Sequence, residues 1–325
     1  MSAGRVLFLY ENEVPFVHSD LPILRERFEV YPLNCSTGIR MRSLLPALAR
    51  SDLSYSWFAL GYAARAVLAG RIIRRPSVVV SGGWDVISMP EISYGAIRTS
   101  RGRLRARFVL RCANLVLTFS QWSRASIQAL AGRRAELVYI GVDLERFRPN
   151  RAKEDLVVTV GNVTRENFKR KGLETFVRAA RQLPDVSFVL VGRHSNPDAD
   201  ELRAQSPANV HFTGWLPAEQ LSDLLARAKV YVQASYNEGF GLAVAEAMAS
   251  GCVPVVTERG ALPEVVGNVG YYVPYGDPQS TALVIREALG SADRRPRARE
   301  RASELFSLAA RRERLLPLVE SRLQG

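Results

Sequence analysis

Short runs of β-branched and aromatic residues alternate with helical patterns through the second half of the chain, and this alternation most constrains the fold. Six almost continuously apolar runs read as strands: 156–160, 187–191, 210–212, 230–233, 253–256 and 271–273. The segments between them predict helices over 172–183, 199–204, 217–227, 241–250 and 261–266. Apolar strands that alternate with helices are typical of a parallel sheet covered on both faces. The second half is therefore predicted to be a doubly wound α/β domain.

The first half repeats the theme less regularly. It predicts strands near 5–10, 28–32, 52–57, 77–81, 114–119 and 136–139, and helices near 39–49, 60–73, 102–112 and 121–131. Because 149–154 is polar and non-periodic, we predict two domains, 1–149 and 150–300. Residues 301–325 are predicted to form a C-terminal helix that packs back on the first domain. Since open α/β sheets bind ligands beyond the carboxyl ends of their strands, two such domains facing one another predict a cleft.

Composition excludes several classes of protein. The 325 residues are 47% hydrophobic and 23% charged, which is typical of globular domains and excludes bulk disorder. No apolar run reaches the roughly 18 residues of a transmembrane helix, and the strand-like start differs from a signal peptide. Cys35, Cys112 and Cys252 show neither paired nor metal-ligand spacing. We therefore expect a cytoplasmic protein without disulfides or a zinc site.

The net charge of +12 is concentrated in the first half. Residues 1–149 hold 21 Arg, no Lys and 11 acidic residues, whereas residues 150–325 hold 19 Arg, four Lys and 21 acidic residues. The resulting charges, +10 and +2, indicate an anionic partner for the first half.

The segment from Asn237 to Gly251 carries the densest pattern of candidate ligand groups. Gly239 and Gly241 flank Phe240 immediately before a predicted helix, where backbone N–H groups can bind a diphosphate. Glu238 precedes these glycines and Glu246 follows within the helix, and carboxylates accept hydrogen bonds from sugar hydroxyls. The alternative is a tight strand-to-helix turn with Glu246 facing solvent.

This segment resembles the Glu-x7-Glu signature of retaining GT-B glycosyltransferases of family 4, the glycosyltransferase group 1 type. Further segments match the family in the same order: 140–147, Gly161 with Lys171-Gly172, 212–216, 251–256 and 270–273. The resemblance implies a GT-B fold, in which two Rossmann-like domains face a cleft. It also implies a metal-independent hexosyltransferase that needs no cofactor and moves a sugar, with retention, from a nucleotide-diphosphate sugar to an acceptor.

The resemblance also implies roles for individual residues. Glu246 would bind the ribose, and the strand end at Gly214 and Trp215 would lie near the base. Glu238 would act as a catalytic residue and hold the donor sugar and diphosphate together with the backbone of the next four residues, Gly239, Phe240, Gly241 and Leu242.

A basic loop is implied to neutralise the departing diphosphate. Lys171 is its expected catalytic cation, and fixed cations at a leaving group lower the barrier. Family members commonly place an Arg where this chain has Asn162. Arg165 is the expected substitute, with Lys169 and Arg170 as alternatives. A solvated basic loop is the other interpretation.

Several further candidates are weaker. The loop after Tyr10 lacks the glycines of many family members, and His18 within it is an acceptor-side candidate or a surface histidine. Asp85 lies where family members often have a His near the donor, which makes it a catalytic candidate; the alternative is a turn acid. Asp198 and Asp200 resemble a metal-binding pair, but they follow Pro197 at a predicted helix start, where acidic residues are favourable. We therefore expect no metal.

Residues 98–111 predict a basic amphipathic helix in which Arg103, Arg107 and Arg111 lie on one stripe. This stripe suits an anionic membrane surface or an acidic glycan, so Arg103 and Arg107 are acceptor-side candidates. A solvated helix face is the alternative. Because no platform of aromatic side chains is interleaved with these arginines, we expect no nucleic acid.

We therefore predict a cytoplasmic glycosyltransferase whose acceptor is a glycan, a lipid-linked molecule or a small molecule. In one alternative the protein is peripheral at the inner face of the membrane. Two other interpretations remain: a nucleotide-sugar epimerase or phosphorylase on the same fold, or a membrane- or polyanion-binding protein with a vestigial sugar site.

Overall fold

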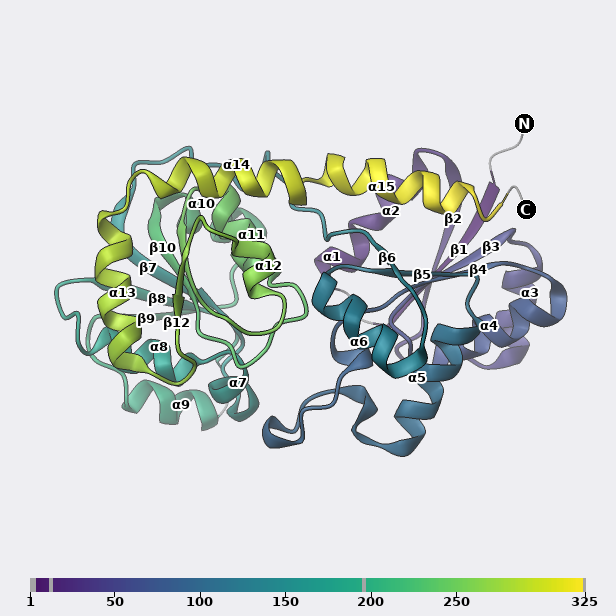
Figure 1. The fold of residues 1–325 in the computed structure, drawn as a ribbon, viewed down its shortest axis with the longest axis horizontal. Helices are drawn as coiled ribbons and strands as arrows, with labels where there is room; N and C mark the ends of the chain where they lie inside the picture. The colour runs from purple at the N-terminus through teal and green to yellow at the C-terminus, as the bar shows by residue number, and fades with distance from the viewer. Residues whose placement is uncertain (1–3, 12–13, 195–196, 324–325) are drawn as a thin grey trace. The chain divides into compact units, whose positions relative to one another are not determined.

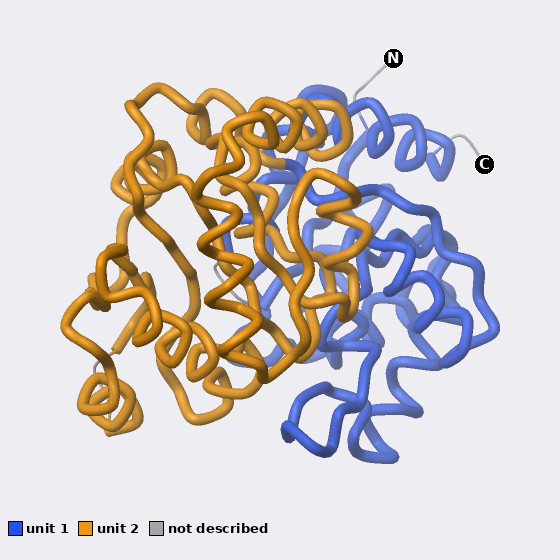
Figure 2. The backbone as a smooth tube through the Cα atoms, turned by 60° about the vertical axis from the view of Figure 1, so that its left-hand side comes forward, with its two compact units in different colours: residues 1–141, 308–325 blue, residues 142–307 orange. Residues whose placement is uncertain are grey.

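The computed structural model describes residues 4–11, 14–194 and 197–323 (Figure 1). The chain forms two compact units, residues 1–141 with 308–325, and residues 142–307 (Figure 2). The sequence placed the first boundary eight residues later. Residues 142–149 join unit 2 because they pack on its last helix: Val142 N donates to Phe306 O, and Arg299 Nη1 donates to Phe147 O.

Unit 1 contains a parallel six-stranded sheet. Its order is β2 (Phe28–Asn34), β1 (Gly4–Tyr10), β3 (Leu53–Trp57), β4 (Ser77–Val80), β5 (Leu115–Thr118) and β6 (Glu136–Leu137). The α-helices are α1 (Pro15–His18), α2 (Asp20–Arg25), α3 (Met41–Ala49), α4 (Gly61–Ile73), α5 (Ser100–Cys112), α6 (Gln121–Ala131) and α15 (Leu308–Glu320). Three 3₁₀ turns follow β4: η1 (Trp84–Val86), η2 (Pro90–Ile92) and η3 (Ala96–Arg98).

Alternation along β1 builds a core on each face of this sheet. Leu7 and Leu9 join a buried cluster with side chains from α3, α4, α5 and α6. Phe8 points to the opposite face and stacks on Tyr55 with ring centroids 5.4 Å apart. Successive side chains of a strand point to opposite faces, so these helices and the elements on the other side cover the sheet in two layers.

A buried ion pair fixes α15 within unit 1. Arg311 Nε and Nη2 donate to the two carboxylate oxygens of Asp20, at 2.6 and 2.9 Å. Arg311 Nη1 also donates to the carbonyls of Val138 and Tyr139, and Tyr55 Oη donates to Asp20. The sequence predicted one helix over 301–325. The structure divides this region at Ser307, which is extended and separates α15 from α14 (Arg294–Phe306).

Unit 2 contains a second parallel sheet. Its order is β12 (Tyr271–Val273), β11 (Val253–Thr257), β10 (Ala228–Gln233), β7 (Glu154–Val160), β8 (Ser187–Val191) and β9 (Val210–Gly214). Its remaining helices are α7 (Arg165–Arg170), α8 (Leu173–Ala180), α9 (Pro197–Ala204), α10 (Ala218–Arg227), α11 (Leu242–Ala249), α12 (Leu262–Val266) and α13 (Pro278–Gly290). The predicted doubly wound α/β architecture is confirmed for both halves.

Each sheet has one point where the strand order reverses direction. In unit 1 the reversal lies between β1 and β3, and in unit 2 it lies between β7 and β10. Loops on either side of such a switch point diverge, which leaves room for a ligand at the carboxyl ends of the strands. The two switch points are therefore where a site is expected in each unit.

Candidate active site

At the switch point of unit 2, the loops after β7 and β10 pack directly against each other. Tyr236 N donates to Arg170 O at 2.9 Å. Gly172 has φ +67°, and a Cβ there would lie 2.0 Å from Ala234 O. A larger residue at 172 would push the loops apart, so this glycine allows the side chain of Lys171 to reach the loop after β10.

Lys171 forms an ion pair with Glu238, and the carboxylate is held by one of its two oxygens. Glu238 Oε1 accepts from Lys171 Nζ at 2.6 Å, from Ser235 Oγ at 2.9 Å and from Gln233 Nε2 at 3.3 Å. Both charged side chains are largely buried, 19% and 10% exposed. Among the described residues no donor contacts Oε2, so this oxygen is available to accept a hydrogen bond from a ligand.

The charges around this pair keep the carboxylate ionised. Burial alone would raise the pKa of Glu238, but the charges of Lys171 and Arg170, with hydrogen bonds from Lys171 and Ser235, lower it overall. Burial lowers the pKa of Lys171, and Glu238 opposes that shift. The site thus presents an ionised carboxylate beside a partly desolvated cation.

The structure brings Arg170, rather than Arg165, to Lys171. Arg165 is 64% exposed and pairs with Glu201 at 2.5 Å and Asp198 at 3.6 Å. Arg170 is 15% exposed, and its charge acts on both members of the Lys171–Glu238 pair. Arg170 Nη2 donates to Asn167 Oδ1 at 2.7 Å, which fixes the guanidinium. Lys169 is exposed.

Glu246 lies on the second turn of α11 with its carboxylate unused by the protein. Among the described residues it has no side-chain hydrogen bond or ion pair. Its side chain is half-buried, and burial raises the pKa of Glu246 to about 8, opposed by Arg146. Near neutral pH the unliganded group is therefore mostly the neutral acid, and hydroxyl donors that bind it favour the ionised carboxylate, so Glu246 is a candidate ligand contact.

The start of α11 presents backbone donors between the two glutamates. Val244 N and Ala245 N donate to Gly241 O, so the N–H groups of Gly241, Leu242 and Ala243 precede the first helical hydrogen bonds. Gly241 has φ +95° and ends the loop that begins at Gly239. The Phe240 side chain is buried against Phe306, with ring centroids 5.3 Å apart. Any ligand contact from Phe240 therefore comes from its backbone.

Gly214 is the last residue of β9, and Trp215 follows it at the carboxyl end of the strand. Gly214 has φ +80°, and a Cβ there would lie 3.3 Å from His194 Nε2. Trp215 is 63% exposed. An exposed indole in this position provides a flat apolar face for stacking.

Asp198 is engaged by a neighbouring cation. Its Oδ2 accepts from Arg165 N at 2.8 Å, and Asp198 also pairs with the guanidinium of Arg165. In the described parts of the chain, no group of three or more His, Cys, Asp or Glu side chains is placed to share a metal ion. The absence of an essential metal stays a prediction.

In unit 1, a cavity of about 720 Å³ lies at the switch point. Aromatic side chains line it from the segments that follow β1, β3 and β4: Phe16 in α1, Phe58, and Trp84 in η1. Arg65 and Arg105 add two cations, and Glu11 adds a carboxylate. Arg105 Nε is shielded from solvent and has no partner among the described residues. This pocket combines stacking surfaces with an unsatisfied donor.

Asp85 is buried in the loop that carries Trp84. Its oxygens accept from Ala59 N at 2.8 Å, Ser81 Oγ at 2.5 Å, Gly82 N at 3.2 Å and Gly83 N at 3.1 Å. These bonds tie the loop after β4 to the end of β3. The geometry is that of a turn acid, and a catalytic role for Asp85 stays a prediction.

The acceptor-side candidates lie outside the cavity at the switch point. His18 ends α1 and packs edge-on against Tyr10 at 4.7 Å. Arg103 and Arg107 line a separate cavity of about 500 Å³ together with Trp122. Arg111 Nε donates to Ala131 O at 2.8 Å. The predicted basic stripe is therefore partly engaged by the protein itself.

Sequence reasoning missed several residues of these two sites. Tyr231, Gln233 and Ser235 form a hydrogen-bonded row that ends on Glu238. Tyr231 and Gln233 lie on one face of β10 and Ser235 continues the spacing of two beyond its end, so polar residues within and just after an apolar strand were the available signal. The Gly-poor loop after β1 gave no comparable signal for the aromatic cavity.

Comparisons with known proteins agree with the glycosyltransferase resemblance of the sequence in unit 2. Residues 154–291 match the family model described as Glycosyl transferases group 1. Sulfoquinovosyl transferase SQD2 of Arabidopsis thaliana is 28% identical over 64% of this chain and 42% of its own length. MMP alpha-(1->4)-mannosyltransferase of Mycolicibacterium hassiacum is 32% identical over 59% of this chain and 50% of its own length. The predicted resemblance to group 1 glycosyltransferases is confirmed.

Solved structures share the fold. HepE of Anabaena, in complex with UDP and glucose, has a TM-score of 0.80 at 19% identity, covering 98% of this chain and all of its own. Sucrose-phosphate synthase of Thermosynechococcus elongatus has a TM-score of 0.78 at 20% identity, covering 98% of each chain. The expected GT-B fold is confirmed. By contrast, the chain spans about half the length of the curated relatives it matches. No described helix is both long and apolar enough to cross a membrane.

Proposed function

We propose that this chain is a glycosyltransferase that transfers a sugar from a nucleotide-diphosphate sugar, bound by unit 2, to an acceptor bound by unit 1. The observation that carries the proposal is the pairing of Lys171 with Glu238 at the switch point, with Glu238 Oε2 and the Glu246 carboxylate both available. HepE, which shares the fold, is described with UDP and glucose. That ligand class matches the donor groups found here.

The donor is proposed to lie along the start of α11. Glu246 accepts hydrogen bonds from the ribose hydroxyls, and the N–H groups at Gly241 and Leu242 bind the diphosphate. Glu238 Oε2 accepts from a hydroxyl of the sugar. Trp215 stacks on the base. In this arrangement Glu238 Oε2, the Glu246 carboxylate and the first N–H groups of α11 each receive a partner.

Lys171 and Arg170 are proposed to stabilise the leaving group. The bond between the anomeric carbon and the diphosphate oxygen breaks, and negative charge develops on the departing nucleoside diphosphate. Cations already fixed by Glu238 and Asn167 stabilise this charge without reorganising. Retention is proposed to follow from attack on the same face, with the acceptor hydroxyl passing its proton to the leaving phosphate oxygen as the new glycosidic bond forms.

The cavity of unit 1 is proposed to bind the acceptor, a glycan, a lipid-linked sugar or a small molecule. Aromatic side chains stack on the apolar faces of sugar rings, while Arg65, Arg105 and Glu11 pair with charged or hydroxyl groups. Membrane association through α5 and location in the cytoplasm belong to the same proposal.

The proposal is tested with a panel of nucleotide-diphosphate sugars, following release of free nucleoside diphosphate with and without added sugar acceptors. A transferase releases nucleotide faster when acceptor is present. A nucleotide-sugar epimerase would release nucleotide equally fast without acceptor, and binding of no donor would contradict the assignment of unit 2. Activity is expected to persist in EDTA, and its loss there would contradict metal independence.

A further inference from the structure

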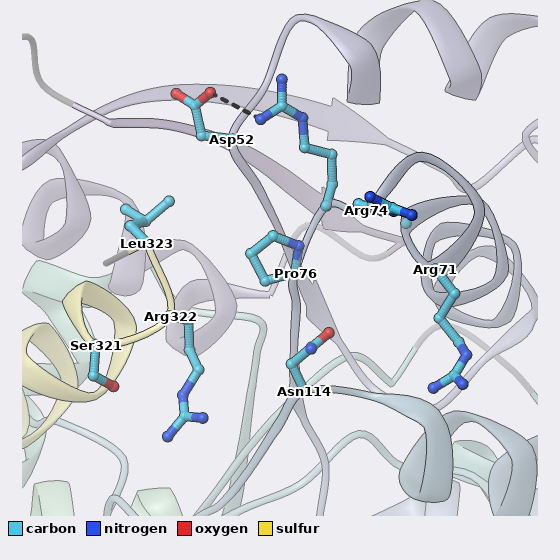
Figure 3. Close-up of a pocket in the computed structure, with 10 residues that line it drawn as sticks. Asp52, Arg71, Arg74, Pro76, Asn114, Ser321, Arg322 and Leu323 are labelled. Carbon is cyan, nitrogen blue, oxygen red and sulfur yellow. Dashed lines mark ion pairs between the residues drawn. The ribbon is translucent and has the colours of Figure 1, made fainter. Parts of the chain in front are cut away.

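A basic pocket of about 650 Å³ lies in unit 1, at the opposite ends of the strands from the aromatic cavity. Asp52, Pro76 and Asn114 line it, and each immediately precedes a strand, β3, β4 or β5. Figure 3 shows these residues together with the end of α4 and the end of α15. The pocket is therefore at the amino ends of the strands, whereas the proposed substrate sites are at carboxyl ends.

Four arginines and one aspartate supply the charge of this pocket. Arg71, Arg74 and Arg322 have no carboxylate partner among the residues the structure describes, and all three are exposed. They come from segments about 250 residues apart in sequence, which the fold of unit 1 brings together. Like charges gathered in one hollow repel each other, so an anion that binds there relieves an unfavourable arrangement.

The pocket is held in shape by the protein. Arg75 N donates to Gly70 O at 2.8 Å, and a Cβ on Gly70 would lie 2.6 Å from Arg75 O, so the chain turns sharply here. Arg74 occupies the left-handed region at φ +56°. Asp52 pairs with Arg75 at 3.5 Å, but it also accepts from Arg5 N and Arg5 Nε. The negative charge of Asp52 is thus compensated largely by Arg5, which does not line the pocket.

Neutral donors complete the site. Asn114 Oδ1 accepts from both Ser77 N and Ser77 Oγ, which leaves Asn114 Nδ2 as a donor toward a ligand. Ser321 adds a hydroxyl. Guanidinium groups match phosphate oxygens with paired hydrogen bonds, and the volume exceeds that of a single phosphate ion. We infer that this pocket binds the phosphoryl group of a phosphate-bearing ligand, at a site separate from sugar transfer.

The test uses Arg71→Gln combined with Arg322→Gln, because both side chains are exposed and cap no helix. The matched control is Arg297→Gln with Arg314→Gln, two exposed arginines outside the described cavities. Each pair of substitutions is made in the parent chain and in the Lys171→Ala variant. Phosphate binding at the pocket is thereby distinguished from phosphate binding at the proposed donor site. Inorganic pyrophosphate is titrated by calorimetry, and sedimentation is measured with phosphatidylcholine vesicles containing phosphatidic acid.

The pocket pair is expected to weaken binding of at least one probe about tenfold in both backgrounds, while the control pair leaves it unchanged. Loss with pyrophosphate alone identifies a soluble phosphorylated ligand, and loss with vesicles alone identifies a lipid headgroup. The inference is overturned if the parent binds neither probe, or if the pocket and control pairs weaken binding equally. Because donor turnover is measured separately, this result is independent of the proposed transferase activity.

Discussion

The two switch points differ in how much of the site the protein has already built. In unit 2 the loops after β7 and β10 pack so closely that Gly172 is required, and Lys171 is fixed on Glu238. In unit 1 the loops after β1 and β3 instead leave a cavity of about 720 Å³ lined by Arg105, whose Nε has no hydrogen-bond partner among the described residues. The site of unit 2 holds charged side chains in fixed positions, whereas the site of unit 1 contains an open cavity.

This difference follows from what each region is proposed to bind. A diphosphate leaving group presents the same charge in every turnover, so cations fixed beforehand stabilise it at no reorganisation cost. An acceptor has its own shape, and a cavity with aromatic walls takes its specificity from the side chains that line it. Changes in unit 2 are therefore expected to affect chemistry, and changes in unit 1 to affect acceptor affinity.

Lys171→Ala is expected to produce the largest effect. Removing a preorganised charge from the leaving group should lower kcat by about 100- to 1,000-fold, with a smaller change in donor KM. Steady-state kinetics with saturating acceptor checks this. Lys169→Ala, which removes an exposed lysine from the same loop, should keep activity. An effect on KM alone would assign Lys171 to binding rather than to chemistry.

Glu246→Gln is expected to weaken donor binding by about 1–3 kcal/mol, because an amide accepts hydroxyl hydrogen bonds less strongly than a carboxylate. Calorimetry with the nucleoside diphosphate measures this loss. Glu287→Gln, an exposed glutamate on α13, is the matched control. Unchanged affinity in folded Glu246→Gln would contradict the ribose assignment.

The same residue predicts a pH dependence of stability. The pKa of Glu246 is raised by burial from 4.5 to about 8 in the folded state. Between these values the folded state binds more protons than the unfolded state, so this group makes stability fall as pH rises through that window, by up to about 1.4 kcal/mol per pH unit. Denaturant unfolding of the parent and Glu246→Gln from pH 5 to about 8 should show the variant gaining stability relative to the parent. A constant difference would contradict the raised pKa.

Arg105→Gln is expected to raise acceptor KM roughly tenfold while donor KM stays constant. The reason is that the Arg105 side chain lines the cavity and its Nε has no hydrogen-bond partner among the described residues, so we expect this guanidinium to pair with an acceptor group. Arg101→Gln, on the exposed side of the same helix, is the control. If donor KM changed instead, the division of roles between the two units would be wrong.

Neutralising Arg103 and Arg107 together is expected to have the smallest effect, a loss of about 1 kcal/mol per charge in binding to anionic vesicles. Both side chains line a cavity of unit 1, so part of their charge is directed away from a flat surface. Vesicle sedimentation with added salt as a parallel treatment measures the loss. Equal sedimentation of the variant and the parent would leave α5 as a solvated helix.

The sequence was most informative where the chain repeats a regular pattern. Apolar strands and the Glu238-to-Glu246 segment predicted the doubly wound fold and the carboxylates at the start of α11. The partner of Lys171 was harder to predict, because the choice between Arg165 and Arg170 depends on how α7 turns. Glu201 and Asp198 draw Arg165 away, and these contacts join residues more than 30 positions apart. The cavity of unit 1 depends on four separate loops, which no local pattern describes.

The ion pair between Asp20 and Arg311 also determines when unit 1 can be completed during synthesis. The two residues are 291 positions apart, and all of unit 2 lies between them. Domains emerging from the ribosome commonly fold in order from the N-terminus. In unit 1, however, the Asp20 carboxylate has no buried cation beside it until Arg311 has been synthesised. Unit 2 is continuous in sequence and can fold before its predecessor is finished. Helix α15, which follows unit 2 in the sequence, thus completes the fold of unit 1.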